Sequence, residues 1–73
     1  MFSVYIVIEH WFDDGSISAL PYLKEEDAYS DYQSRKRLYE KSRGSVTEDR
    51  ERKHFWDDSI YECMIVKEEL LDG

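Results

Sequence analysis

The chain has 73 residues, of which 41% are hydrophobic, 15% aromatic and 37% charged, and this composition argues against intrinsic disorder and for one small folded domain. A single core of this size leaves little room for a substrate cavity, which disfavours an enzyme. With 10 Lys and Arg against 17 Asp and Glu, the net charge of -7 also disfavours direct binding of nucleic acid, because phosphate contacts need a surplus of basic side chains.

The first segment, residues 2–12, predicts a β-strand, because β-branched and aromatic residues dominate it. Apolar side chains alternate onto both of its faces, with Val4, Ile6 and Ile8 on one and Tyr5, Val7 and Trp11 on the other. A strand with two apolar faces is typical of the centre of a sheet.

A hairpin is predicted next, because Asp14 and Gly15 both tolerate the positive φ that tight turns require. The returning strand would be residues 16–22. Its Pro21 has no N–H to give to a ladder, so we expect this strand at an edge of the sheet, or ending at that residue.

The pattern then changes to that of a helix over residues 24–43. One stripe repeats at spacings of four, three and four residues: Ala28, Tyr32, Arg35 and Tyr39. The first half of this segment is acidic and the second half basic, an order that complements the helix dipole. Gly44 is a natural stop for such a helix.

Residues 45–56 are ambiguous between loop, helix and strand. Ser45 and Glu48 have the spacing of a capping box, which would begin a short second helix. Against this, His54, Phe55 and Trp56 precede 57-DDS-59, a turn-like stretch before an evident strand. We favour a mobile loop followed by a short strand over residues 53–56.

The last strand is predicted from residue 60 to residue 67, with Tyr61, Cys63 and Ile65 on one face and Met64 and Val66 on the other. The acidic tail that follows, residues 68–73, is expected to fray. The ordered domain would therefore span residues 1–67.

These elements predict an α+β fold, with a small antiparallel sheet of three to four strands and one helix packed on one face, in the order ββαββ or ββαβ. One helix covers only one face of such a sheet. The opposite face still carries apolar side chains, so solvent or a partner must meet it.

No catalytic, metal or cofactor site is predicted. His10 and His54 lack the spacing of metal ligands, and the chain has only one cysteine that could add to them. The pairs Asp13/Asp14 and Asp57/Asp58 are explained by turn chemistry. Without a nucleophile or a pocket, paired acids do not indicate hydrolysis.

A soluble protein of a reducing cytosol is expected. The lone Cys63 cannot form an internal disulfide and reads as a small buried hydrophobe. The apolar run in residues 1–10 lacks the basic region of a signal peptide and is too short to span a bilayer, so no membrane association is expected.

The aromatic residues give the best indication of function, because they exceed what one helix on a sheet needs and are the types enriched at binding hot spots. Core packing accounts for four of them: Tyr5, Tyr32, Tyr39 and Tyr61. For Trp11, Phe12 and Trp56, which adjoin acidic turns, partner contact and capping of the core are equally supported.

We therefore predict a partner-binding surface with apolar anchors and an acidic rim. The anchors are Trp11, Phe12, Tyr29 and Trp56. The rim acids that would orient a basic partner are Asp13, Asp14, Asp57 and Asp58. Such a surface suits an extended or helical segment of a basic protein.

With its aromatic strand 4-VYIVIEHW-11, its turn 13-DDGS-16 and its acidic balance, the chain resembles the small RNA polymerase-binding transcription regulators of lytic bacteriophages, in particular that of a Xanthomonas phage. The resemblance lies in length and character and transfers no residue role. It implies a monomer in the cytoplasm of the bacterial host that binds the largest polymerase subunit, inhibits host transcription initiation and acts as an antiterminator.

Two other classes of function remain open. An acidic DNA mimic that inhibits a host nuclease or defence complex would need aligned carboxylates, and its binding would weaken steeply with salt. An enzyme would need a convergent polar pocket, which these spacings do not predict.

Overall fold

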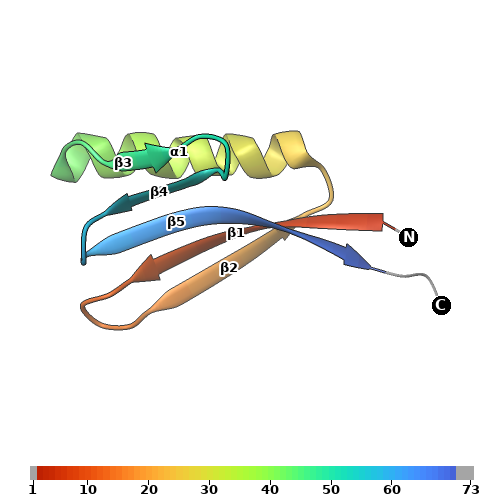
Figure 1. Ribbon diagram of the computed structural model, residues 1–73, viewed down its shortest axis with the longest axis horizontal. Helices are drawn as coiled ribbons and strands as arrows, with labels where there is room; N and C mark the ends of the chain where they lie inside the picture. Colours follow the sequence, from red (N-terminus) through yellow and green to blue (C-terminus); the bar gives the residue numbers. More distant parts are fainter. Residues whose placement is uncertain (1, 71–73) are drawn as a thin grey trace.

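The computed structural model describes residues 2–70, which form one antiparallel sheet and one helix (Figure 1). In chain order the elements are β1 (Phe2–Trp11), β2 (Ile17–Tyr22), α1 (Glu25–Arg43), β3 (Thr47–Asp49), β4 (His54–Asp57) and β5 (Tyr61–Leu70). The five strands lie in the order β2-β1-β5-β4-β3, and α1 runs across one face. The predicted α+β class is confirmed.

Strand β1 lies inside the sheet, between β2 and β5, as its two apolar faces predicted. Strand β2 is an edge strand, and its Pro21 lies opposite Ile6 of β1. The loop between β1 and β2 is closed by a hydrogen bond of 2.9 Å from the N–H of Trp11 to the carbonyl of Ser16. Within it Gly15 has φ +73, the conformation for which the glycine was expected.

Helix α1 begins one residue after the predicted start and ends at the predicted residue. Three acids, Glu25 to Asp27, lie in its first turn and two basic residues lie in its last turn. Both groups of charges interact favourably with the helix dipole. Gly44 ends it with φ +106, and its N–H donates to the carbonyl of Glu40 at 3.0 Å. The buried residues of the helix are the predicted stripe without its arginine: Ala28, Tyr32 and Tyr39.

The prediction of three to four strands was wrong by one strand, because β3 was missed. Its three residues show no apolar alternation, and Glu48 at their centre is held by the Tyr32 hydroxyl and Lys36 instead of by hydrophobic burial. The alternative of a second helix over this segment is also wrong. The short strand predicted at residues 53–56 exists as β4, one residue further along.

Strand β5 is longer than predicted. It continues to Leu70, which lies opposite Phe2, so the expected fraying is wrong for residues 68–70. The length of β1 explains this, because its first residues supply a partner for each residue of the acidic stretch. Residues 71–73 of the predicted tail lie outside the described residues.

The core lies between α1 and the sheet. Seven residues are buried there: Val7, Ala28, Tyr32, Tyr39, Phe55, Tyr61 and Cys63. Burial of Cys63 confirms the reading of this residue as a small core hydrophobe and raises the pKa of its thiol to about 12. Within residues 2–70, no helix is long and apolar enough to cross a membrane.

Candidate binding surface

The strand register divides the sheet into two faces, because side chains alternate along each strand and directly paired residues share a face. The odd-numbered residues of β1 and β5, such as Val7 and Cys63, point towards α1 and form the helix-side face. The even-numbered residues, such as Ile8 and Met64, form the opposite face, which we call the open face. No helix or strand of residues 2–70 covers the open face.

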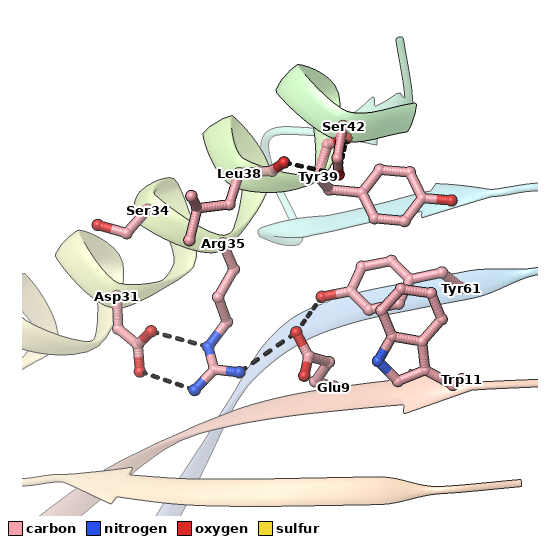
Figure 2. Close-up of a pocket in the computed structure, with 9 residues that line it drawn as sticks. All are labelled: Glu9, Trp11, Asp31, Ser34, Arg35, Leu38, Tyr39, Ser42 and Tyr61. Atoms are coloured by element: carbon pink, nitrogen blue, oxygen red, sulfur yellow. Dashed lines mark hydrogen bonds and ion pairs between the residues drawn. The ribbon is translucent and has the colours of Figure 1, made fainter. Parts of the chain in front are cut away.

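A groove of about 390 Å³ lies on the helix side, between α1 and β1 (Figure 2). Its walls combine the aromatic rings of Trp11, Tyr39 and Tyr61 with the exposed Leu38. The Trp11 ring packs against Tyr61, with centroids 4.4 Å apart, and lies beneath the guanidinium of Arg43. Of the two readings left open for Trp11, these contacts fit capping of the core.

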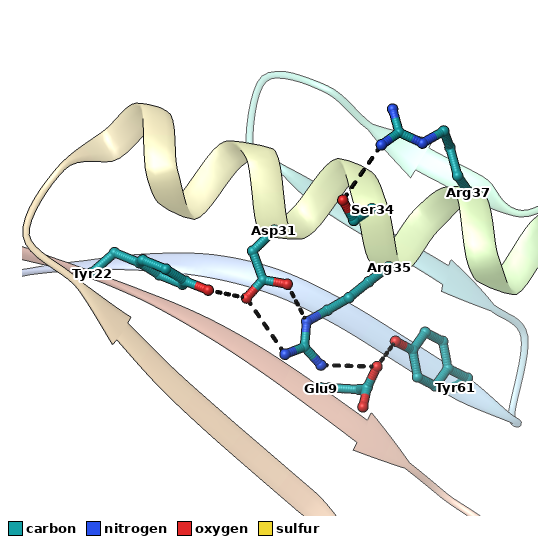
Figure 3. A network of polar contacts seen from close by, with 7 residues as sticks. All are labelled: Glu9, Tyr22, Asp31, Ser34, Arg35, Arg37 and Tyr61. Carbon is teal, nitrogen blue, oxygen red and sulfur yellow. Dashed lines mark hydrogen bonds and ion pairs between the residues drawn. The ribbon is translucent and has the colours of Figure 1, made fainter.

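The polar groups that enter this groove bind one another (Figure 3). Arg35 donates to both carboxylate oxygens of Asp31, at 2.7 and 3.4 Å, and lies 3.3 Å from Glu9. The hydroxyl of Tyr22 donates to Asp31 at 2.6 Å, and that of Tyr61 donates to Glu9. These contacts link four elements, β1, β2, α1 and β5, so the main role of the network is to stabilise the fold.

Burial and hydrogen bonding together determine the pKa values of the groups in this network. Burial alone would raise the pKa of Asp31, but hydrogen bonds from Arg35 and Tyr22 outweigh it and hold the pKa below the usual range of a carboxyl. Burial and the hydrogen bond to Glu9 raise the pKa of Tyr61. Both groups therefore stay in their ordinary charge states at neutral pH, which is unlike a general acid or base.

A second polar cluster attaches β3 to the helix. Glu48 accepts from the Tyr32 hydroxyl at 2.8 Å and pairs with Lys36 at 2.8 Å. Burial alone would raise its pKa, but these two partners lower it. Asp57 is held similarly, because it accepts from the Tyr39 hydroxyl at 2.6 Å. This predicted rim acid therefore lies on the helix side.

The open face has an apolar centre of half-buried side chains on its two middle strands. Ile6 lies opposite Val66, and Ile8 lies opposite Met64. Further apolar side chains continue this centre over the neighbouring positions of the face: Phe2, Val4, Ile17, Ala19, Pro21, Trp56 and Leu70. A contiguous apolar surface of this kind is typical of a protein-binding site.

Two of the predicted anchors belong to the open face or border it. Trp56 is directly opposite Glu62 and its ring lies 4.7 Å from that of His54. Phe12 is 39% exposed at the end of β1 and packs edge-on against His10, at 4.4 Å. Tyr29 lies elsewhere, on the first half of α1, where it stacks on Tyr32 and remains 42% exposed.

The remaining predicted acids gather at one end of the sheet. Asp13 and Asp14 lie in the β1–β2 loop and Asp58 in the β4–β5 turn, and the two turns are joined by a hydrogen bond from the Phe12 N–H to the carbonyl of Ile60. The N–H of Ser16 donates to Asp14, which lowers the pKa of this carboxyl. These three exposed acids therefore form a charged rim beside Phe12.

Two histidines of the open face converge on one carboxylate. Nε2 of His54 lies 3.0 Å from one oxygen of Glu62, and Nδ1 of His10 lies 3.3 Å from the other. No local pattern predicts the contact of these three residues, because they come from three different strands. Over the part of the chain that the structure describes, no group of three or more His, Cys, Asp or Glu side chains is arranged to hold a metal ion.

Charge is separated between the two sides of the sheet. The open-face positions of the five strands carry no lysine or arginine, whereas they carry three acids, Asp49, Glu62 and Glu68. Six of the ten basic residues belong to α1 or the residue before it: Lys24, Arg35, Lys36, Arg37, Lys41 and Arg43. The open face is therefore apolar at its centre and acidic around it.

No family model, curated protein or solved structure matches the chain. The candidate surface accordingly rests on geometry alone. The alternation of Val4, Ile6 and Ile8 indicates its apolar centre, although the predicted anchors are aromatic residues.

Proposed function

We propose that this protein is a non-enzymatic, monomeric binding module that engages bacterial RNA polymerase through its open face. The observation on which the proposal rests is the apolar centre around Ile8 and Met64, which no helix or strand of residues 2–70 covers. A monomeric protein rarely exposes such a surface without a binding role. Phe12 and Trp56 lie beside this centre as aromatic anchors.

The charges on and around the open face indicate what kind of partner would bind there. The open face has acidic residues and no lysine or arginine at its strand positions, and Asp13, Asp14 and Asp58 add charge at one end. A basic segment with an apolar side complements this arrangement. A second copy of the chain would instead bring acids against acids, which disfavours pairing of two open faces.

The partner that we propose is the one implied by the resemblance to phage transcription regulators in length and character. A protein of this class would occupy a short segment of the largest polymerase subunit and hinder σ-dependent engagement of promoters. The same contact would persist on elongating polymerase and support antitermination on phage genes. The bacterial cytoplasm is then the place of action.

Binding to immobilised, purified bacterial RNA polymerase at moderate salt tests this proposal. We expect the wild-type chain to bind, and Phe12→Ala and Trp56→Ala each to weaken affinity by at least about tenfold, because truncating an interface anchor costs about 2 kcal/mol. Leu38→Ala is the matched control, because Leu38 is 68% exposed on α1 rather than on the open face.

The contradicting results are equally specific. If the wild-type chain does not bind polymerase, polymerase is excluded as the partner. If Leu38→Ala loses as much affinity as Phe12→Ala and Trp56→Ala, the open face is excluded as the binding surface. Binding to a nuclease or defence complex that disappears at moderate salt would favour DNA mimicry, since charge-dominated contacts are screened by salt.

A further inference from the structure

Both histidines of the chain meet at one carboxylate of the open face. His10 belongs to β1 and His54 to β4, and Glu62 belongs to β5, which lies between these two strands. Nδ1 of His10 and Nε2 of His54 lie 3.3 and 3.0 Å from the two oxygens of Glu62, so each oxygen has one imidazole as its partner. All three side chains are partly exposed. We call these three residues the histidine cluster.

The histidine cluster contacts both aromatic anchors of the open face. Phe12 packs edge-on against the ring of His10, and the ring of Trp56 lies 4.7 Å from that of His54. Trp56 is also directly opposite Glu62 in the ladder between β4 and β5. A partner segment that covers Phe12 and Trp56 would therefore lie close to both imidazoles.

The charged groups that face the cluster come from the neighbouring elements of the open face. On β3, Asp49 lies opposite His54, and it pairs with Arg52 at 3.9 Å. On β2, the residue opposite His10 is the uncharged Ile17. Helix α1 lies on the other face of the sheet and adds no charge here. The three rim acids lie in the turns at the adjacent end of the sheet.

Protonation of the two imidazoles changes the sign of the charge in this region. Histidine is the side chain that changes its charge between about pH 5 and 8, whereas carboxylates stay ionised and arginine stays protonated over that range. With neutral imidazoles, the two carboxylates of Glu62 and Asp49 and the one guanidinium of Arg52 give a net charge of -1. With both imidazoles protonated, the same group of side chains carries +1.

We propose that the histidine cluster is a proton-dependent switch of the open face, which binds a basic partner segment when both imidazoles are neutral and releases it when they are protonated. The inference rests on the proposed function in one respect, that this face binds a basic segment of another protein. Positive charge beside Phe12 and Trp56 repels the lysines and arginines of such a segment. Protonation also turns both contacts of Glu62 into ion pairs, so its carboxylate is less available to a cation of the partner.

Two substitutions remove the titration and keep the contacts of Glu62. The amide nitrogen of asparagine takes the place of Nδ1, and that of glutamine takes the place of Nε2, so His10→Asn and His54→Gln each still present a donor to Glu62. Neither amide gains a proton between about pH 5 and 8. The double variant H10N/H54Q is therefore the matched control, because its cluster is fixed in the neutral form.

The first measurement is the affinity for purified bacterial RNA polymerase at about pH 7.5 and about pH 5.5, at constant ionic strength. The wild-type chain should lose at least about tenfold in affinity in acid, because binding that requires the loss of one proton weakens by about tenfold per pH unit. The double variant reports the titration of the polymerase itself and should lose less than about threefold. Equal losses would overturn the inference.

The second measurement uses the free protein and an anionic apolar dye, anilinonaphthalene sulfonate. The sulfonate should bind the apolar centre poorly beside a negative cluster and well beside a positive one. Dye fluorescence with the wild-type chain should rise at least about threefold from about pH 7.5 to about pH 5.5, and it should change little with the double variant. Circular dichroism checks that both proteins stay folded over this range. The same rise in both proteins would overturn the inference.

Failure here and failure of the proposed function are distinguishable. Polymerase affinity that depends equally on pH in both proteins would overturn the switch, whatever the dye shows, and leave the open face as the binding surface. If neither protein binds polymerase at either pH, but the dye responds only to the wild-type chain, the polymerase is rejected and the switch in the charge of this face is retained.

Discussion

The two faces of this sheet differ in how their side chains are buried and hydrogen-bonded. On the helix side, the rings of three tyrosines are buried and that of Tyr22 is partly buried, while the hydroxyls of these four donate to Glu9, Asp31, Glu48 and Asp57. Within residues 2–70, no buried side-chain nitrogen or oxygen lacks a partner. The open face has a half-buried aliphatic centre and no covering element. The first face therefore specifies the fold, and we propose that the second is the binding surface.

The largest expected effect comes from two adjacent aromatic residues on opposite faces. Phe55 is 0% exposed in the core, whereas Trp56 lies half-buried on the open face. We expect Phe55→Ala to lower the free energy of unfolding by about 3–5 kcal/mol, and Trp56→Ala by about 1 kcal/mol despite its larger ring. Urea denaturation measures both, and equal losses would contradict the division between the faces.

A smaller effect is expected from the ion pairs of the helix side. Arg35→Met leaves Glu9 and Asp31 without their cation, and should lower the free energy of unfolding by about 1–3 kcal/mol. Arg37→Met is the control, because Arg37 is exposed on the same helix and should change stability by less than about 0.5 kcal/mol. Thermal denaturation of both variants compares them, and identical melting temperatures would refute the role of the network.

Acid should weaken the helix side through the same network. The pKa values of Asp31 and Glu48 are lowered in the folded protein, so their stabilising contribution is complete above the unfolded-state pKa of about 4 and is lost as pH falls through the lower folded values. Stability should therefore decline below about pH 5. Asp31→Asn should flatten this decline, and an unchanged slope would contradict the assigned shift.

The smallest expected effect tests one hydroxyl. Tyr39→Phe keeps the ring that stacks on Tyr61 and removes only the hydrogen bond to Asp57. The expected loss is about 1 kcal/mol of unfolding free energy, with no change in partner affinity. Denaturation and binding measured on the same sample check both, and a large loss of binding would move the functional surface to the helix side.

The elements that were predicted correctly are those whose local pattern agrees with their burial. The stripe of Ala28, Tyr32 and Tyr39 faces the core as its spacing indicated. Pro21 lies in an edge strand, and Gly44 ends the helix. In each case the residue type itself limits the local structure, so the sequence alone was sufficient to predict the element.

The parts that were missed depend on contacts between distant residues. Strand β3 is held by Glu48 through Tyr32 and Lys36, which no local pattern in 47-TED-49 reveals. Residues 68–70 are ordered by pairing with the start of β1, which lies more than 60 positions earlier in the chain. The convergence of His10, His54 and Glu62 likewise requires the strand order.

The candidate site was foreseen only in part. Phe12 and Trp56 lie beside the open face, but Trp11 and Asp57 lie on the helix side, because neighbouring residues of a strand point to opposite faces. Adjacency in the sequence therefore grouped side chains that the sheet separates. Had the anchors been chosen by alternation, Ile8 and Met64 would have been named.

The most direct test of the central claim is the affinity of Met64→Lys for purified bacterial RNA polymerase, compared with that of Leu38→Lys. Both substitutions introduce a lysine, one at the centre of the open face and one at an exposed position of α1 beside the helix-side groove. We predict at least about a tenfold loss of affinity for Met64→Lys and less than about twofold for Leu38→Lys, with both variants folded. Equal affinities would contradict the assignment of the open face as the binding surface.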